Sequence, residues 1–201
     1  MGSQRVLCQA SRDRLGTSLA CPLWLQGKCV ELLRDMLPSV RRVAALGYAA
    51  DPFSKSFVDQ VQLAGRATGI EIDPIMMLNG PDEIDSAFAA MGTVRANAIV
   101  VQATFSTKHV ADLALKHGLA AATNFRSFAE AGGLMSYGHQ STALYWHMAL
   151  FVQKVLQGNK PADMPVEQPT NFELVINLKT AKALGLTISE SFLLRADEVI
   201  K

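Results

Sequence analysis

The sequence predicts an α/β fold built around a doubly wound parallel sheet. Short apolar runs, which are typical of buried strands, alternate with segments whose apolar residues recur at helical spacing. The helical segments between strands are about 10 to 15 residues long, which implies right-handed crossovers between parallel strands. With 201 residues, of which 49% are apolar, the chain can bury a sizeable core in one domain or slightly more.

Caps and breakers set the boundaries of the predicted elements. Asp51 and Pro52 suit the first turn of a helix, carboxylates at 82 and 83 favour another, and glycines close several helices. In chain order, the pattern predicts a helix at 29–37, a strand at 43–46, a helix from 51 to about 69, a strand at 70–78, a helix at 81–92, a strand at 98–101, a helix at 106–116, a strand at 119–123, a short helix at 125–131, a strand at 134–137, a helix at 142–156, a strand at 172–178 and a small helix at 180–184.

Two connections carry specific backbone signals. The short helix at 125–131 is followed by Gly132 and Gly133, and at least one of them is expected to adopt a positive φ angle that would strain a β-branched residue. The stretch 158–169 holds three of the eight prolines, which favours an extended connection over a packed element.

Composition argues against several kinds of partner. The net charge is +1 with no block of like charge, so no nucleic-acid partner and no membrane-surface patch are expected. No apolar run reaches the roughly 18 residues of a transmembrane helix. The apolar stretch 19–25 is interrupted by Pro22 and is too short for the core of a signal peptide.

No metal, cofactor or catalytic residue is predicted. Cys8, Cys21 and Cys29 have spacings that fit no zinc pattern with histidine partners, so they are expected to be free or semi-buried thiols. The histidines are scattered over helices and loops. The chain contains no Gly-x-Ser-x-Gly elbow, phosphate loop, Gly-x-Gly-x-x-Gly or His-Glu-x-x-His sequence.

Candidate ligand-binding residues lie where three predicted strands end. In an open parallel sheet, ligands bind beyond the carboxyl ends of the strands, where helix amino termini converge. The strand-to-helix joints at 47–54, 102–107 and 123–128 each combine aromatic rings with small hydroxyl or amide residues, which suits an amino acid or a similar small organic acid. The candidates are Tyr48, Asp51, Ser54, Thr104, Phe105, Asn124 and Phe125.

A purely structural role for these joints is the alternative. Asp51, Ser106 and Asn124 are residue types that cap helices, and capping alone can explain them. The aromatic residues of the joints can equally be packing against another lobe.

The carboxyl-terminal sequence resembles a known family. Residues 165–201, PVEQPTNFELVINLKTAKALGLTISESFLLRADEVIK, and the segment GGLMSYG at 132–138 are similar to the end of ABC-transporter substrate-binding proteins, a group that includes aromatic amino acid receptors. The resemblance extends back to about Lys28. It implies the type I periplasmic-binding-protein fold, in which the loops that match the three joints line a cleft between two lobes.

The resemblance also implies a division of the chain. Residues 1–27 form a head that matches nothing in the family, 28–133 form the ligand-binding lobe, 134–158 cross to the other lobe, and 159–201 return. The signal peptide and most of the amino-terminal lobe of the family are not recognised in this sequence. The chain is therefore expected to be most of one lobe of a two-lobed protein.

The function implied is that of a substrate-binding component, or its truncated remnant, of an ABC importer. Its partners would be a small-molecule ligand and an ABC permease, and ligand binding needs no catalysis. A small flavodoxin-like α/β enzyme and a non-functional fragment are the alternatives. Relatives are periplasmic or lipid-anchored outside the cytoplasm, whereas this chain as given, without a recognised signal peptide, is expected in the cytoplasm. The apolar helix at 142–156 would lack its partner lobe, so a homodimer, a domain-swapped pair or aggregation through it is expected.

Overall fold

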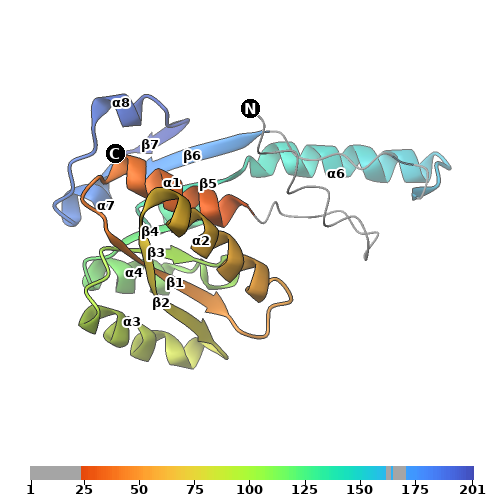
Figure 1. Ribbon diagram of the computed structural model, residues 1–201. Helices are drawn as coiled ribbons and strands as arrows, with labels where there is room; N and C mark the ends of the chain where they lie inside the picture. Colours follow the sequence, from red (N-terminus) through yellow and green to blue (C-terminus); the bar gives the residue numbers. More distant parts are fainter. Residues whose placement is uncertain (1–23, 162–163, 165–170) are drawn as a thin grey trace.

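The computed structural model of the chain, shown in Figure 1, describes residues 24–161, 164 and 171–201. Residues 1–23 lie outside this part, and with them Cys8, Cys21 and most of the predicted head. Much of the predicted extended connection at 158–169 also lies outside the described residues.

Seven strands form one sheet in the described part of the chain, in the spatial order β2-β1-β3-β4-β5-β6-β7. Strands β1 to β5 are parallel, β6 is antiparallel to β5, and β7 is parallel to β6. The order of the first five strands is that of a doubly wound sheet, so the predicted α/β fold is confirmed. The strands are β1 (Arg42–Tyr48), β2 (Glu71–Leu78), β3 (Ala98–Val101), β4 (Ala120–Thr123), β5 (Met135–His139), β6 (Phe172–Asn177) and β7 (Glu198–Ile200).

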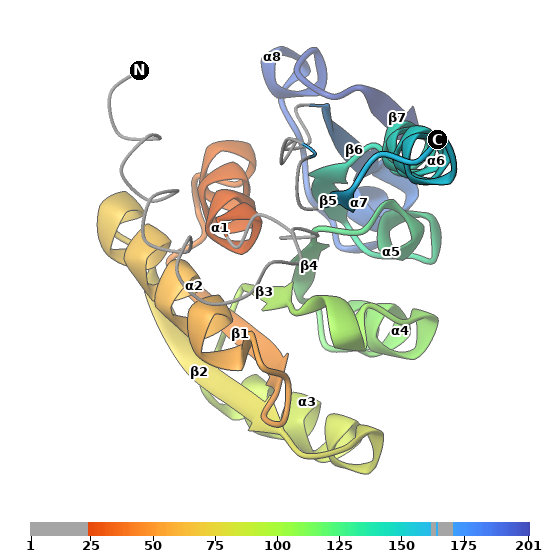
Figure 2. The same cartoon turned by 90° about the vertical axis from the view of Figure 1, so that its right-hand side faces the viewer.

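Helices cover both faces of the sheet, as Figure 2 shows for α1 and α2 on one side and α3, α4 and α5 on the other. The helices are α1 (Leu25–Met36), α2 (Ser54–Thr68), α3 (Ile84–Thr93), α4 (Lys108–Lys116), α5 (Arg126–Glu130), α6 (Ser141–Leu156), α7 (Leu178–Ala183) and α8 (Glu190–Leu193), with short 3-10 turns η1 (Pro81–Glu83) and η2 (Ala103–Phe105).

Two buried clusters, one on each face, hold the layers together. Alternate residues of each strand face opposite sides, so Val43 and Val100 pack under α1 and α2, whereas Leu46 and Val101 pack under α3 and α4. Phe57 and Phe88 are among the largest fully buried side chains of the two clusters. Burying a side chain of this size contributes about 1.5–3 kcal/mol, so the two clusters fix the sheet that carries the joints.

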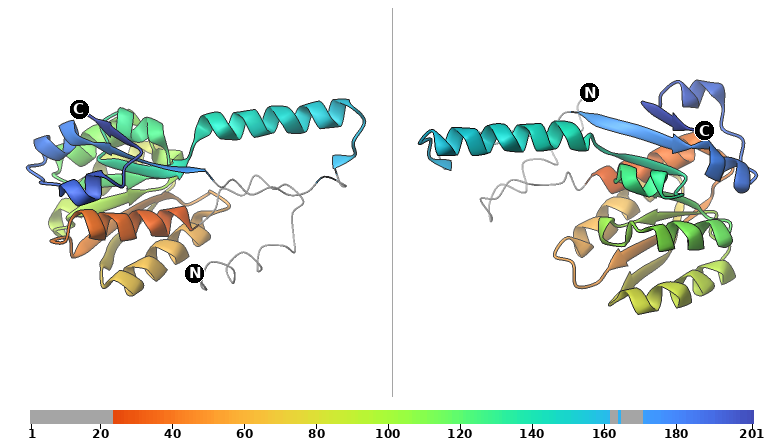
Figure 3. Two further views of the ribbon diagram at one scale, coloured as in Figure 1. Left: turned by 90° about the horizontal axis from the view of Figure 1, so that it is seen from above. Right: turned by 180° about the vertical axis from the view of Figure 1, so that it is seen from behind.

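Helix α6 projects from the sheet as an arm, which both views of Figure 3 show. Several of its apolar side chains are exposed: Tyr145 by 68%, Trp146 by 70% and Leu156 by 82%. The predicted helix at 142–156 is confirmed, and it exposes large apolar side chains at successive positions 145 and 146 rather than along one stripe.

Several predicted helix starts are wrong. Helix α1 begins at Leu25 instead of 29, α2 begins at Ser54 instead of 51, and α4 begins at Lys108 instead of 106. In the last case the hydroxyl of Thr107 caps the helix by accepting from the Val110 amide at 3.3 Å. The helix α8 and the strand β7 were not predicted, because both are shorter than the window in which a periodic pattern can be recognised.

Gly132 has a φ angle of +119°, which confirms the prediction for the glycine pair. Gly133 has no such angle, but a Cβ on it would lie 2.3 Å from the Phe128 ring. The pair therefore meets two separate requirements, a left-handed turn and close packing.

Candidate functional site

The sheet topology brings the three predicted joints to one edge. Strands β1, β3 and β4 are consecutive neighbours and all parallel, so the segments that follow Tyr48, Val101 and Thr123 emerge side by side. The chain leaves β1 toward α2 on one face and β3 toward α4 on the other. This divergence is the switch point at which open α/β sheets bind ligands.

Two hydrogen bonds connect the first joint, residues 47–54, to the second: one from the backbone amide of Tyr48 and one to the carboxylate of Asp51. Asp51 Oδ2 accepts a hydrogen bond from Thr104 Oγ1 at 3.0 Å, and its Oδ1 accepts from the Phe53 amide at 2.7 Å. Asp51 therefore stabilises the turn before α2 and does not cap the helix itself, whose N-cap position is Phe53. Ser54 is the first residue of α2 and is half-buried; its amide donates to the Asp51 carbonyl at 2.9 Å.

Gln102 positions the first joint against the second. Its side chain is 4% exposed, and its Oε1 accepts from the Tyr48 amide at 2.8 Å. The Gln102 carbonyl accepts from the Phe105 amide at 3.0 Å, which shapes the η2 turn. As a result the rings of Tyr48 and Phe105 meet edge to face, with centroids 5.9 Å apart.

Two hydroxyls connect the second joint to the third. Ser106 Oγ lies 2.8 Å from Thr123 Oγ1, and Thr123 Oγ1 donates to the Val101 carbonyl at 3.0 Å. Because each hydroxyl has one proton, Ser106 is the donor to Thr123 when Thr123 donates to the carbonyl. Thr123 is fully buried, so these bonds have little competition from water.

The third joint presents a buried amide and an exposed ring. Asn124 is 5% exposed, whereas Phe125 is 44% exposed and occupies the N-cap position of α5. Neither Asp51, Ser106 nor Asn124 is the N-cap residue of a helix, so the capping alternative does not explain them. Asn124 also lies against β5, because a Cβ on Gly138 would be only 1.8 Å from the Asn124 carbonyl oxygen.

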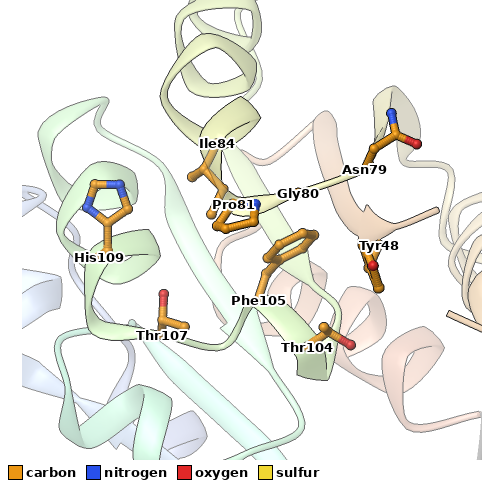
Figure 4. A pocket seen from close by; sticks show the side chains of 9 residues that line it. All are labelled: Tyr48, Asn79, Gly80, Pro81, Ile84, Thr104, Phe105, Thr107 and His109. Atoms are coloured by element: carbon orange, nitrogen blue, oxygen red, sulfur yellow. The ribbon is translucent and has the colours of Figure 1, made fainter. Parts of the chain in front are cut away.

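A pocket of about 450 Å³ opens at this edge and is shown in Figure 4. Phe105 stands in the middle of its wall, with Tyr48 on one side and His109 on the other. Three of the predicted site residues line it, whereas Asp51, Ser54, Asn124 and Phe125 do not. The lining residues are Tyr48, Asn79, Gly80, Pro81, Ile84, Thr104, Phe105, Thr107 and His109.

Sequence reasoning missed the part of this wall that follows β2. Residues 81–84 were assigned only to the start of a helix and residues 79 and 80 to no element, although the same strand-end rule that selected the other joints applies to Leu78-Asn79-Gly80. Gln102 and Thr123, which hold the joints together, were also missed, because nothing local to a buried Gln or Thr distinguishes it from an ordinary strand end.

The wall is mainly apolar, and its polar groups are few. Among the residues described as lining it there is no lysine or arginine. Three carboxylates are bonded to lining residues. Asp51 accepts from Thr104, Glu83 accepts from the Asn79 amide at 2.9 Å, and Asp85 Oδ2 lies 3.1 Å from His109 Nε2. Such a wall can hold a flat apolar group, with carboxylate oxygens near its rim for a donor or a cation.

A buried thiol lies beneath the third joint. Cys29 of α1 is fully buried, and its Sγ contacts the Thr123 carbonyl at 3.4 Å. Burial raises the pKa of this thiol to about 12, with a smaller opposing effect from a hydrogen bond with the Tyr137 backbone. It is therefore a structural thiol, in line with the prediction of a semi-buried cysteine.

Two features are absent from the part of the chain that the structure describes. No group of three or more His, Cys, Asp or Glu side chains in this part of the chain is arranged to hold a metal ion. None of the helices there has both the length and the apolar character needed to cross a membrane.

The fold and the edge together define a class of protein. A doubly wound sheet of this strand order, with a pocket at its carboxyl edge, has the type I periplasmic-binding-protein fold. Residues 23–200 match the family described as ABC transporter substrate binding protein, and the chain belongs to this family. It is a family of substrate-binding proteins rather than of enzymes. No curated protein sequence gives a significant match.

Solved structures agree with this assignment. An ABC domain in complex with L-Trp from Streptococcus pneumonia is 28% identical with a TM-score of 0.78, and the match covers 88% of this chain and 62% of that one. A conserved domain protein from Vibrio cholerae is 22% identical with a TM-score of 0.79, over 89% of this chain and 60% of its own. A ligand-free, open substrate-binding protein from Clostridium difficile is 18% identical with a TM-score of 0.65, over 87% and 59%.

These matches differ in what they support. The second and third, below 25% identity, show the fold alone. The chain spans about three fifths of the length of all three structures.

Proposed function

We propose that this chain is the substrate-binding component of an ABC importer and binds a small organic ligand, such as an amino acid, without catalysis. The observation that carries the proposal is the pocket at the carboxyl edge of the sheet, near its switch point. The chain that forms this sheet belongs to a substrate-binding family. Three independently predicted residues, Tyr48, Thr104 and Phe105, line this pocket.

The chemistry of the wall favours a ligand with a ring. Phe105 and Tyr48 offer a ring face and a ring edge, and Pro81 and Ile84 complete an apolar surface. The carboxylate of Asp51 does not line the pocket but is bonded to Thr104, which does, and it suits an amine on a ligand that reaches beyond the wall. A neighbour of 28% identity is in complex with L-Trp, which supports an aromatic amino acid as the first ligand to test.

The site we propose extends beyond the pocket to the whole edge. Ser54, Asn124 and Phe125 do not line the pocket, but they belong to joints that emerge beside it. In a two-lobed protein, the second lobe would cover a ligand held by the pocket, and the ring of Phe125, which is 44% exposed, would be available for contact with that lobe.

The division of the chain remains a proposal built on the same reasoning. Residues 28–133 and 159–201 would form the ligand-binding lobe, and 134–158 the crossover to a second lobe, which leaves this sheet after β5. Of the head proposed at 1–27, residues 25–27 belong to α1 of the lobe itself. The projection of α6 away from the sheet supports a role beyond this lobe.

The proposed partners and location follow from the family. An ABC permease would receive the ligand, and an extracytoplasmic location fits the family. The exposed apolar side chains of α6 would be buried in a homodimer through residues 142–156 in the isolated chain.

Calorimetric titration with L-tryptophan and a panel of other amino acids tests the proposal. For a ligand that carries an amine, Asp51→Asn should weaken binding by about 10- to 100-fold, because a charge-assisted hydrogen bond is lost without a change of shape. Asp59→Asn is the matched control, since Asp59 lies on α2, is exposed to solvent and pairs with Lys55 at 2.8 Å.

The same titration separates the alternatives. If a bound compound is consumed on incubation, the chain is an α/β enzyme. If no compound of the panel binds at millimolar concentration, the non-functional fragment is favoured. Equal effects of Asp51→Asn and Asp59→Asn would show that the ligand does not bind near the first joint.

A further inference from the structure

Four ring side chains gather where α6 joins the body of the protein. The centroid of the Phe172 ring lies 5.1 Å from that of Trp24, 5.9 Å from that of Tyr137 and 4.9 Å from that of His139. Trp24 and Tyr137 are 6.5 Å apart. We call these four residues the aromatic latch.

The latch joins three separate segments of chain. Trp24 immediately precedes α1, Tyr137 lies in the middle of β5 and His139 ends it, and Phe172 begins β6. His139 pairs with Phe172 across the antiparallel ladder, and the next residue, Gln140, donates its amide to the Asn171 carbonyl at 3.2 Å. Because α6 begins at Ser141 and projects freely, the direction of this arm is set at the latch (Figure 3).

His139 is the unusual member of the latch. Both of its ring nitrogens are buried, and neither has a hydrogen-bond partner among the described residues. A neutral imidazole tolerates this better than an imidazolium, which would bury two donors and a charge. Burial accordingly lowers the pKa of His139 below its ordinary value.

The charged and titratable groups around the latch each have a partner outside it, and Lys28, Asp197 and Cys29 also act electrostatically on Tyr137. On α1, Lys28 pairs with Glu31 at 2.7 Å and the Cys29 thiol contacts the Thr123 carbonyl. Beyond β6, Asp197 accepts from the Leu174 amide at 2.7 Å.

Two further titratable groups lie on the strands themselves. Glu173 lies on the opposite face of β6 from Phe172, 3.3 Å from Arg126. Within the latch, Tyr137 has its pKa raised by burial first of all, so it stays neutral over the range in which histidine titrates.

We propose that the aromatic latch is an acid-sensitive device that sets the direction of the α6 arm. With His139 neutral, its ring completes the packing of Phe172 and holds the end of β5 against the start of β6 and of α1. With His139 protonated, the ring moves into water, Phe172 loses a packing partner and its own contact with Trp24 loosens, and the connection at 139–141 is free to change direction.

The aromatic latch packs against the third joint of the candidate site. The coupling between latch and ligand binding described here rests on the proposed function. Gly138, next to His139, lies so close to the Asn124 carbonyl oxygen that a Cβ would not fit between them. A displacement at 138–139 therefore moves the third joint. Protonation of His139 would then lower the affinity of this edge for a ligand.

The sign of the pH dependence follows from the lowered pKa. The stabilising packing is fully present above about pH 6.5, the ordinary pKa of histidine, and is lost as the pH falls through the lower pKa of the folded protein. The transition is therefore expected at mildly acidic pH, below the ordinary pKa of histidine.

Tryptophan fluorescence tests the latch without a ligand. The chain has two tryptophans, so Trp146→Phe leaves Trp24 as the reporter. Between pH 8 and pH 5, Trp24 emission should shift to the red and its quenching by acrylamide should increase, with circular dichroism unchanged. His139→Phe should abolish the transition, and His109→Gln, the matched control at an exposed histidine, should retain it.

Two outcomes would overturn the proposal: no transition in the parent over this range, or an unchanged transition in His139→Phe. If that variant does not fold, the ring titration of His139 measured by NMR in the unsubstituted chain decides the question, since a midpoint at or above about 6.5, the ordinary pKa of histidine, contradicts the latch. Titration with L-tryptophan at neutral and acidic pH gives a separate result. If L-tryptophan binds and its affinity does not fall in acid, the coupling between the latch and the candidate site is wrong, but the latch itself is not contradicted. If L-tryptophan does not bind at any pH, the result argues against the proposed function and not against the latch.

Discussion

Substitution of Gly138 by alanine should disrupt the packing of the third joint against β5. An ideal Cβ at this position would lie 1.8 Å from the Asn124 carbonyl oxygen and 2.8 Å from its carbonyl carbon. Carbon–oxygen contacts in proteins are rarely shorter than about 3.3 Å, so the two backbones must separate by about 1.5 Å. No rotamer change can relieve this overlap, because both partners are main chain.

The expected loss is at the upper end of the range for overpacking, about 2–3 kcal/mol. Gly138 pairs with Glu173 in the antiparallel ladder, so β5 cannot move away without loss of ladder bonds. For a chain of this length, such a loss lowers the melting temperature by about 4–12 °C. Urea unfolding and differential scanning calorimetry measure the two quantities.

Gly92→Ala is the matched control for this experiment. Gly92 lies in α3, and the nearest atom to a Cβ there is His117 Nδ1 at 3.9 Å. Alanine should stabilise the helix by up to about 1 kcal/mol. The reasoning is refuted if Gly138→Ala unfolds within about 0.5 kcal/mol of the parent chain, since that is the effect of an ordinary surface substitution.

Three further predictions concern the backbone, the buried thiol and the arm. Gly132→Val should destabilise by about 1–3 kcal/mol, because φ is +119° and the space around a Cβ is otherwise open; an unchanged urea midpoint would contradict backbone strain. In a chain with the cysteines at 8 and 21 replaced by serine, Cys29 should react with a thiol reagent at pH 8 only after unfolding, and rapid labelling of the native chain would be inconsistent with its burial. The free energy of unfolding should also decline as the pH rises above about 8.5 toward the raised pKa of Cys29. Sedimentation at micromolar concentration should show self-association through α6 that Trp146→Glu weakens, and a monomeric parent chain would rule this out.

The sequence by itself determined the fold class and most of the elements. Local periodicity is enough to recognise β3, where prediction and structure coincide, and α6, where they differ by one residue. It also determined which joints share an edge, because parallel strands connected by helices must all end on the same side. The positive φ angle in the glycine pair followed from the helix end alone.

Only the tertiary structure decided which residues of those joints meet. The bonds from Thr104 to Asp51 and from the Tyr48 amide to Gln102 join segments more than fifty positions apart, and no local pattern encodes them. The predicted start of α2 was wrong for the same reason: Asp51 was assigned to a cap, but its carboxylate is held in a turn by Thr104, which lies in η2 after the neighbouring strand β3. Likewise, the strand Phe172–Asn177 could be recognised from its apolar residues, whereas its antiparallel pairing with β5, which brings His139 onto Phe172, depends on the path of the chain through α6 and back. Periodicity reports the environment of each element, but the contacts between elements depend on strand order and register, which only the folded chain fixes.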